Sequence, residues 1–136
     1  NSEVVFNTGN GFSSLYLKCL EEFDLAWNGL ESLDGIEYCI HARYLDFSNN
    51  ELSDISNLCL LTNVEELYLE NNLIIYIDSL DNLVNLRILD ISGNQVNDIT
   101  PLLELENLEF VNLIGNPIPQ FQLEELRAKG VLVMAH

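Results

Sequence analysis

Hydrophobic residues along this chain recur with a period of 22 residues. Within one unit they follow the spacing L-x-x-L-x-L-x-x-N-x-L-x-x-L-x-x-L-x-x-L, in which one asparagine interrupts the leucines. The asparagines form a column without insertion or deletion: Asn28, Asn50, Asn72, Asn94 and Asn116. A fixed period of this length is the signature of a solenoid, in which each unit is one coil.

Two spacings within the unit predict its local structure. The L-x-L pairs, such as Leu67 and Leu69, alternate as a short strand requires, with both leucines inward and the residue between them outward. The later spacing of three suits 3₁₀-like turns, in which side chains three residues apart eclipse each other. One coil cannot bury its leucines alone, so we expect stacked coils whose strands form a parallel sheet.

The repeat resembles the 22-residue class of leucine-rich repeat, which occurs in bacterial internalins and in a eukaryotic regulator of type-1 phosphatase. The resemblance covers roughly residues 20–121. It implies an α/β solenoid, a right-handed superhelix with the parallel sheet on its concave face. The helix and strand expected at the end of the chain also resemble the C-terminal cap of the bacterial proteins.

We expect a single leucine-rich repeat domain over residues 1–136, with an N-terminal cap at 1–22, repeats at 23–118 and a C-terminal cap at 119–136. From Phe12 the apolar residues follow a helical period, and Ser13 or Ser14 is a suitable N-cap. This helix would cover the open end of the core.

At the other end, the prolines of the 116–119 segment end the regular turn. Residues 120–129 predict a helix that ends at Gly130, and residues 131–134 predict a last strand beside the fifth. The residues available to pack from this helix are Phe121, Leu123, Leu126 and Ala128. With both ends covered, we expect a complete folding unit.

The asparagine column has a structural explanation. Where the chain leaves a strand, backbone groups lose their ladder partners and need others. A buried asparagine amide offers two donors and an acceptor, enough for its own coil and the next. A second column precedes the strands, and we interpret its histidine as a hydrogen-bonding substitute for asparagine rather than a metal ligand: His41, Asn63, Asn85 and Asn107.

Composition and charge limit the partners. Hydrophobic residues make up 48% of the 136 residues, which is ample for one core, and no apolar run approaches the roughly 18 residues of a membrane span. The net charge of −17 repels nucleic acid and anionic lipid, so we expect a basic protein partner and no binding of nucleic acid. We also expect a monomer that does not insert into membranes.

The cysteines favour a reducing compartment. Cys19, Cys39 and Cys59 are odd in number and lack metal-ligand spacing. Cys39 replaces a core leucine, and Cys59 falls on the convex side. This favours a cytoplasmic location and leaves a secreted or surface-attached one open. Because the chain starts at Asn1 rather than Met, we expect a fragment or a processed product, from which a signal sequence would already be gone, so the lack of one does not inform location.

No catalytic motif stands out. The sequence lacks a nucleophile elbow, a phosphate loop, zinc spacing and any cluster that includes histidine, so we expect no enzyme activity and no cofactor. A cation between Asp24 and Asp46 is an alternative that the flat strand disfavours, because no loop wraps around the ion. We therefore assign no metal site.

The candidate binding face follows from counting back from each asparagine, because residues six, four, two and one before it face the concave side. These positions hold no lysine or arginine. The candidate partner-binding residues are Glu22, Asp24, Trp27, Tyr44, Asp46, Glu66, Tyr68, Glu70, Ile88, Asp90, Phe110, Asn112 and Ile114. Because acids lie toward the first three coils and apolar residues toward the last, we expect a basic partner segment with an apolar anchor.

Two observations keep a structural interpretation open. Leu-Asp-Leu is an ordinary strand sequence in this family, so the acidic face could be merely hydrated and the domain a spacer in a larger protein. One further column alternates in sign, which predicts an ionic ladder that fixes strand register: Glu21, Arg43, Glu65, Arg87 and Glu109.

Overall fold

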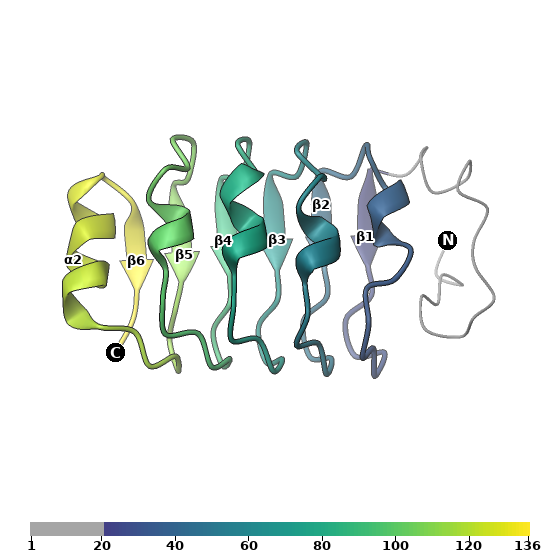
Figure 1. The fold of residues 1–136 in the computed structure, drawn as a ribbon, viewed down its shortest axis with the longest axis horizontal. Helices are drawn as coiled ribbons and strands as arrows, with labels where there is room; N and C mark the ends of the chain where they lie inside the picture. The colour runs from purple at the N-terminus through teal and green to yellow at the C-terminus, as the bar shows by residue number, and fades with distance from the viewer. Residues whose placement is uncertain (1–20) are drawn as a thin grey trace.

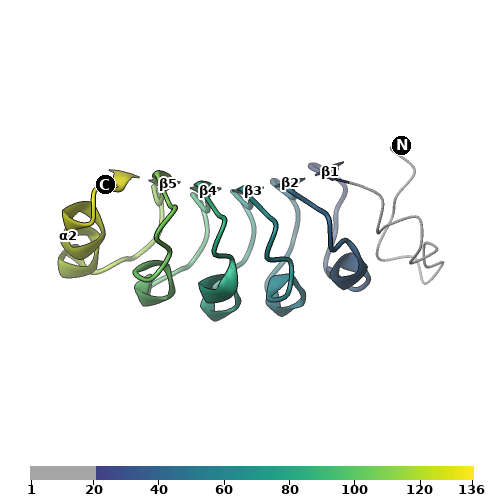
Figure 2. The ribbon, with the colours of Figure 1, turned by 90° about the horizontal axis from the view of Figure 1, so that it is seen from above.

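The chain folds as a stack of coils in a computed structural model that describes residues 21–136. Strands line one side of the stack and short helical turns line the other (Figures 1 and 2). The stack bends gently, with the strands on the inner side (Figure 2). The helix expected from Phe12, its capping serines Ser13 and Ser14, and Cys19 lie outside the described residues.

The described residues form one six-stranded parallel sheet in the order β1-β2-β3-β4-β5-β6. Its strands are β1 Glu22–Asp24, β2 Tyr44–Asp46, β3 Glu66–Tyr68, β4 Ile88–Asp90, β5 Phe110–Asn112 and β6 Leu132–Met134. Adjacent strands pair residues that are 22 apart in the sequence, such as Leu45 with Leu67. The predicted parallel solenoid sheet is confirmed, although β1 begins at Glu22, which we had placed in the cap.

Each coil starts with a strand and then forms a short helical turn on the opposite side of the stack. We number the coils by their strands, so coil 3 starts with β3. The turns are 3₁₀ helices, as the spacing of three predicts: η1 Ile36–Tyr38, η2 Ser56–Leu58, η3 Asp78–Asn82 and η4 Thr100–Leu102. Between strands and turns lies one continuous core that runs from Phe23 to Val133. Cys39 is fully buried in it, as predicted, and this burial raises the pKa of its thiol to about 12.

The buried asparagines bind backbone groups of two coils at once. Asn72 accepts a hydrogen bond from the Leu52 N–H at 2.9 Å and donates to the carbonyls of Phe47 and Leu69 at 3.1 and 3.0 Å. The same pattern recurs at Asn50, Asn94 and Asn116.

Asn28 differs from the rest of its column. Its side chain is exposed and donates to the Ala26 carbonyl of its own coil at 2.9 Å. The residues before Glu21 lie outside the described part of the chain, so Asn28 is joined to a neighbouring coil here through its N–H, which donates to Oδ1 of Asn50.

The second asparagine column also joins coils. The amides of Asn63, Asn85 and Asn107 each donate to a carbonyl 23 residues upstream, at 2.8–2.9 Å. For His41 the corresponding residue is Lys18, which lies outside the described residues, so its role as a substitute for asparagine stays a prediction.

The C-terminal end holds a helix and a strand where the sequence predicts them. Helix α2, Gln120–Ala128, buries Leu123 and Leu126 against the core. The expectation that Phe121 and Ala128 also pack was wrong, because both face solvent, Phe121 with 62% of its surface exposed. The guanidinium of Arg127 donates to the carbonyl of Val133 at 3.4 Å, which occupies an acceptor of the last strand.

The predicted ionic ladder is confirmed. Arg43 lies 3.5 Å from Glu21 and 2.9 Å from Glu65, while Arg87 lies 4.0 Å from Glu65 and 3.1 Å from Glu109. The carboxylate hydrogen bonds raise the pKa of both arginines. These pairs are exposed, so the ladder fixes register more than it stabilises the fold.

Substitution of Asn72 by alanine tests the asparagine column. It removes the acceptor of the buried Leu52 N–H and one of the two side-chain amide donors to each of the carbonyls of Phe47 and Leu69. We expect urea denaturation to show a loss of about 3 kcal/mol in the free energy of unfolding. Asn97→Ala, at an exposed position, is the control and should change it by less than about 0.5 kcal/mol. Equal losses in the two variants would contradict the assigned role.

Candidate functional site

The strand register arranges the outward side chains of the sheet in two rows. Each strand buries its middle residue, so the residues on either side of it point to solvent. The first row is Glu22, Tyr44, Glu66, Ile88, Phe110 and Leu132. The second row is Asp24, Asp46, Tyr68, Asp90, Asn112 and Met134. We call these two rows the strand face.

A third line of residues follows where the strands end. Backbone hydrogen bonds between coils continue there, as from the Asn49 N–H to the Glu70 carbonyl at 2.8 Å and from the Gly93 N–H to the Ile114 carbonyl at 2.8 Å. Glu70 and Ile114 therefore border the strand face. With them, the structure brings together all the candidate binding residues except Trp27.

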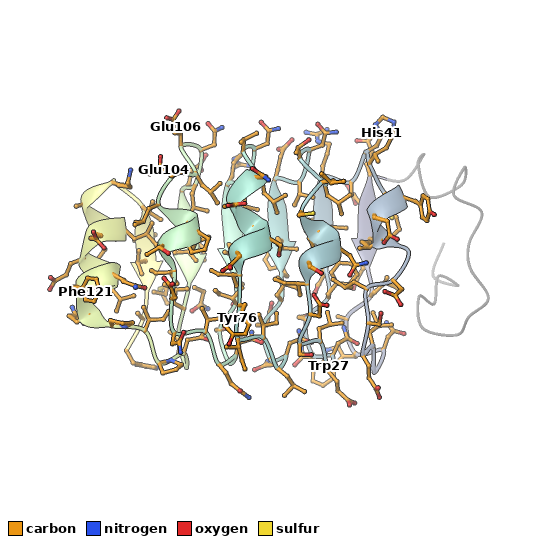
Figure 3. All side chains as sticks on the ribbon, viewed as in Figure 1. Trp27, His41, Tyr76, Glu104, Glu106 and Phe121 are labelled. Carbon is orange, nitrogen blue, oxygen red and sulfur yellow. The ribbon has the colours of Figure 1, made fainter. Side chains whose placement is uncertain are left out.

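Trp27 lies at the margin, three residues past the end of β1 and at the lower edge of the stack (Figure 3). Its backbone is left-handed, with φ of 61°, and 78% of its surface is exposed. The equivalent residues share this conformation and are asparagine or glycine, which tolerate it: Asn49, Asn71, Gly93 and Gly115. Trp27 thus occupies a turn position for which a tryptophan is poorly suited.

Glycine suits position 93 of this column, where the backbone is left-handed with φ of 68°. A Cβ added there would collide with Oδ1 of Asn71. The Asn71 side chain occupies that space while its amide donates to Oδ1 of Asn49 at 3.0 Å. The residues of this column therefore form the turns that border the strand face.

Two residues of the strand face were missed from the sequence. Leu132 and Met134 extend its rows beside Phe110 and Asn112, and they are 64% and 43% exposed. Their signal was the alternation in 131–134, because a strand that buries Val131 and Val133 must turn Leu132 and Met134 outward. They enlarge the apolar end of the strand face.

Some of the acids have a role within their own coil. Oδ1 of Asp46 accepts hydrogen bonds from the N–H and the hydroxyl of Ser48 at 2.9 and 2.7 Å. Asp90 binds Ser92 in the same way, at 3.0 and 2.7 Å. These hydrogen bonds hold the turn after each strand, and the sequence analysis did not predict them. The charges of the two carboxylates still lie on the strand face.

Two tyrosines form the middle of the strand face. The rings of Tyr44 and Tyr68 lie 5.4 Å apart between centroids, tilted by 46°, and the Tyr68 hydroxyl donates to Oε1 of Glu66 at 2.8 Å. Burial raises the pKa of both phenols, helped at Tyr68 by the bond to Glu66 and at Tyr44 by nearby carboxylates. Both phenols are therefore neutral at physiological pH and provide an aromatic surface.

Glu70 is a half-buried carboxylate near two other acids. Burial raises its pKa, and the charges of Asp90 and Asp46 add to the effect. Its Oε1 is buried and has no hydrogen-bond partner. A cationic group from outside would lower the energy of this ionised carboxylate.

The strand face has no basic residue of its own to balance these acids. All four ion pairs among residues 21–136 belong to the ladder of Arg43 and Arg87. In the same part of the chain, no group of three or more His, Cys, Asp or Glu side chains could hold a metal ion. No described helix combines the length and the apolar character that a membrane span needs.

Comparisons with known proteins agree with the repeat. A family model described as leucine-rich repeats (2 copies) matches residues 84–127. No match to this chain exists among the curated proteins.

Solved structures of leucine-rich repeat proteins have a similar fold. An internalin (inlF) from Listeria monocytogenes is 23% identical over 92% of this chain, with a TM-score of 0.56, and the match covers 50% of that chain. Internalin C2 from the same species is 23% identical over 90% of this chain and 73% of its own, with a TM-score of 0.59. A leucine-rich repeat protein from Leptospira interrogans is 22% identical over 90% of this chain and 39% of its own, with a TM-score of 0.69.

Replacement of Trp27 tests the strain at the margin. Trp27→Asn places at this left-handed position the residue found at the next two coils. We expect it to raise the free energy of unfolding by about 1 kcal/mol in urea denaturation, because asparagine tolerates this backbone better. The reciprocal variant Asn49→Trp should lower stability, since it also removes the acceptor of the Asn71 amide. A destabilised Trp27→Asn protein would show that the indole packs instead.

The pH dependence of stability tests Glu70. Because its pKa in the folded protein lies above the ordinary glutamate value of 4.5, ionisation costs the folded state more than the unfolded one. The penalty is absent below pH 4.5 and develops as the pH rises through the raised pKa. We expect Glu70→Gln to raise Tm at pH 7, with the gain disappearing on acidification.

Glu104→Gln is the control for the Glu70 variant. Glu104 is exposed near the upper end of the stack (Figure 3), and its charge is not among those that raise the pKa of Glu70. Calorimetry should give it little change in Tm at either pH. A lower Tm of Glu70→Gln at pH 7 would refute the assigned repulsion.

Proposed function

Because this chain is a leucine-rich repeat protein with an internalin-like fold, we propose that it is a non-catalytic protein-binding module. Its strand face would bind a basic segment of a protein partner that also carries an apolar anchor. Repeat solenoids typically present such extended inner surfaces to protein partners.

One observation carries this proposal: carboxylates that form no ion pair within residues 21–136 lie beside half-buried and exposed apolar side chains on the same sheet. In the first row, Glu66 pairs with Ile88, which pairs with Phe110. The apolar end continues to Leu132, which exposes 64% of its surface. A contiguous exposed apolar group next to unbalanced charge is typical of a binding surface.

The order of the rows suggests how a partner would lie. Lysine or arginine side chains of the partner would lie over Glu22, Asp24, Glu66 and Glu70. An apolar side chain of the partner would contact the apolar end of the strand face, at β5 and β6. A cation near Glu70 would relieve the cost of its ionisation, which burial and the nearby charges of Asp90 and Asp46 raise. The two tyrosines in between would contact the partner without changing conformation, because the Tyr68 hydroxyl is already held by Glu66.

The competing interpretation is a spacer within a longer protein, and one observation favours it. Asp46 and Asp90 serve the turns of their own coils, so part of the acidity has a structural reason. A spacer does not explain Phe110, Leu132 and Met134, because small polar residues would suffice there. The two functions predict different results in the binding experiment below.

Truncation of two aromatic residues tests the binding role. The double variant Tyr68→Ala/Phe110→Ala removes contact area from the middle and the apolar end of the strand face. With a partner captured on the wild-type chain and then purified, we expect calorimetric affinity to fall at least about tenfold. Affinity for the wild type should also fall as salt is raised, because opposite charges meet at the interface.

The matched control is Tyr38→Ala/Phe121→Ala, which truncates the same residue types away from the strand face. Both side chains are exposed, at 47% and 62%, on η1 and α2. This variant should bind like the wild type. Equal binding by both double variants would refute the strand face as the binding site and leave the spacer role.

A further inference from the structure

One turn of the stack departs from its neighbours. Leu73, Ile75 and Tyr76, in the segment between β3 and η3, are 48%, 38% and 73% exposed. The equivalent residues of coils 2 and 4 are all polar or charged: Glu51, Ser53, Asp54, Gln95, Asn97 and Asp98. The chain thus provides its own internal comparison, and only coil 3 of these three exposes an apolar cluster, which we call the coil-3 patch.

Coil 3 lacks a local hydrogen bond that coils 2 and 4 both form in this segment. In coil 2, Oδ1 of Asp54 accepts from the Ser56 N–H at 2.9 Å, and in coil 4, Oδ1 of Asp98 accepts from the Thr100 N–H at 3.0 Å. At the same position coil 3 has Tyr76, whose hydroxyl lies at the far end of the ring and cannot reach the backbone two residues on. Tyr76 therefore does not supply the hydrogen bond that the aspartates of coils 2 and 4 supply, and most of its surface is exposed.

The coil-3 patch borders a hollow of about 330 Å³ between coils 2 and 3. Ser53 and Ser56 line it from coil 2, and Asp54 and Asp78 place carboxylates in the same lining. The volume is at the lower end of the range of ligand pockets, about 300–1,000 Å³, so it suits one or two side chains. Tyr76 lies on the lower half of the side that carries the helical turns, while the strand face lies behind (Figure 3).

We propose that the coil-3 patch is a second interaction site, which holds an apolar side chain of a protein segment with lysine or arginine next to it. The apolar side chain would enter the hollow against Leu73, Ile75 and Tyr76. The neighbouring cation would pair with Asp54 and Asp78, which share the lining. This site is separate from the strand face, so the protein would bind two partners, or two segments of one.

Charge decides between the possible occupants. Hydrogen bonds from Ser56 lower the pKa of Asp54, so this carboxylate is ionised at neutral pH. Two copies of the chain docked through the coil-3 patch would bring Asp54 and Asp78 against their own counterparts, in a molecule with a net charge of −17. An anionic membrane is repelled by the same field. A basic protein segment is the occupant that both the hollow and its carboxylates favour.

A variant built from the chain's own coil 4 tests the proposal. Leu73→Gln, Ile75→Asn and Tyr76→Asp together replace the coil-3 patch with the residues of coil 4. The probe is a phage-displayed library of random peptides, selected on the wild-type chain and then measured on both this triple variant and Tyr68→Ala/Phe110→Ala. We expect a class of peptides that binds the strand-face variant normally and the triple variant about tenfold more weakly. These peptides should carry lysine or arginine beside an apolar residue.

Three results would overturn the proposal. Selected peptides could all bind the triple variant as well as the wild type, or the patch-dependent peptides could lack an excess of lysine and arginine. Alternatively, sedimentation could show that the wild type forms a dimer that the triple variant does not form. Peptides that bind more weakly only to Tyr68→Ala/Phe110→Ala bear on the proposed function of the strand face and not on the coil-3 patch. The two proposals can therefore fail independently.

Two further variants keep the result interpretable. The triple variant restores a turn-forming aspartate, so its Tm is expected to be at least that of the wild type. Tyr76→Ala serves as the single substitution in case the triple variant does not fold, and it should weaken the same class of peptides. Leu60→Gln, which changes an apolar residue that is 72% exposed outside the patch, should leave their binding unchanged.

Discussion

Hydrogen bonds from buried asparagine side chains join neighbouring coils at the point where each strand ends. Without them, buried N–H and carbonyl groups such as those of Leu52 and Leu69 would lack partners. Because each amide binds its own coil and the one before it, equivalent residues of neighbouring coils stay side by side. The pairing of residues 22 apart, and therefore the rows of the strand face, depends on this constraint.

Most of the fold could be predicted from the sequence because a repeat states each spacing several times. The alternation at Leu67 and Leu69 and the later spacing of three specify a strand and a turn, and the ladder around Arg43 agrees with the register that the asparagines set. Exposure at the C-terminal end was harder to predict, since it has no repeated copy. Phe121 fits a helical apolar pattern yet faces solvent, because α2 packs through Leu123 and Leu126.

The candidate site was predictable in its rows and less so in its chemistry. Counting from the asparagines does not show that Asp46 binds Ser48, because a two-residue hydrogen bond depends on how the chain turns after the strand. It also does not give the left-handed backbone of Trp27, although the asparagines and glycines of that column are a signal for it. The site that results is acidic at one end, aromatic in the middle and apolar at the other end.

The central claim is that a partner lies along this surface with its apolar anchor near β5 and β6. Methyl NMR of the chain during titration with the isolated partner tests it most directly, because Ile88, Leu132 and Met134 provide probes on the strand face. The account predicts that these three methyl groups shift together and saturably, and that the shifts weaken as salt is raised. Shifts confined to methyl groups on the side of the helical turns, with these three unchanged, would contradict it.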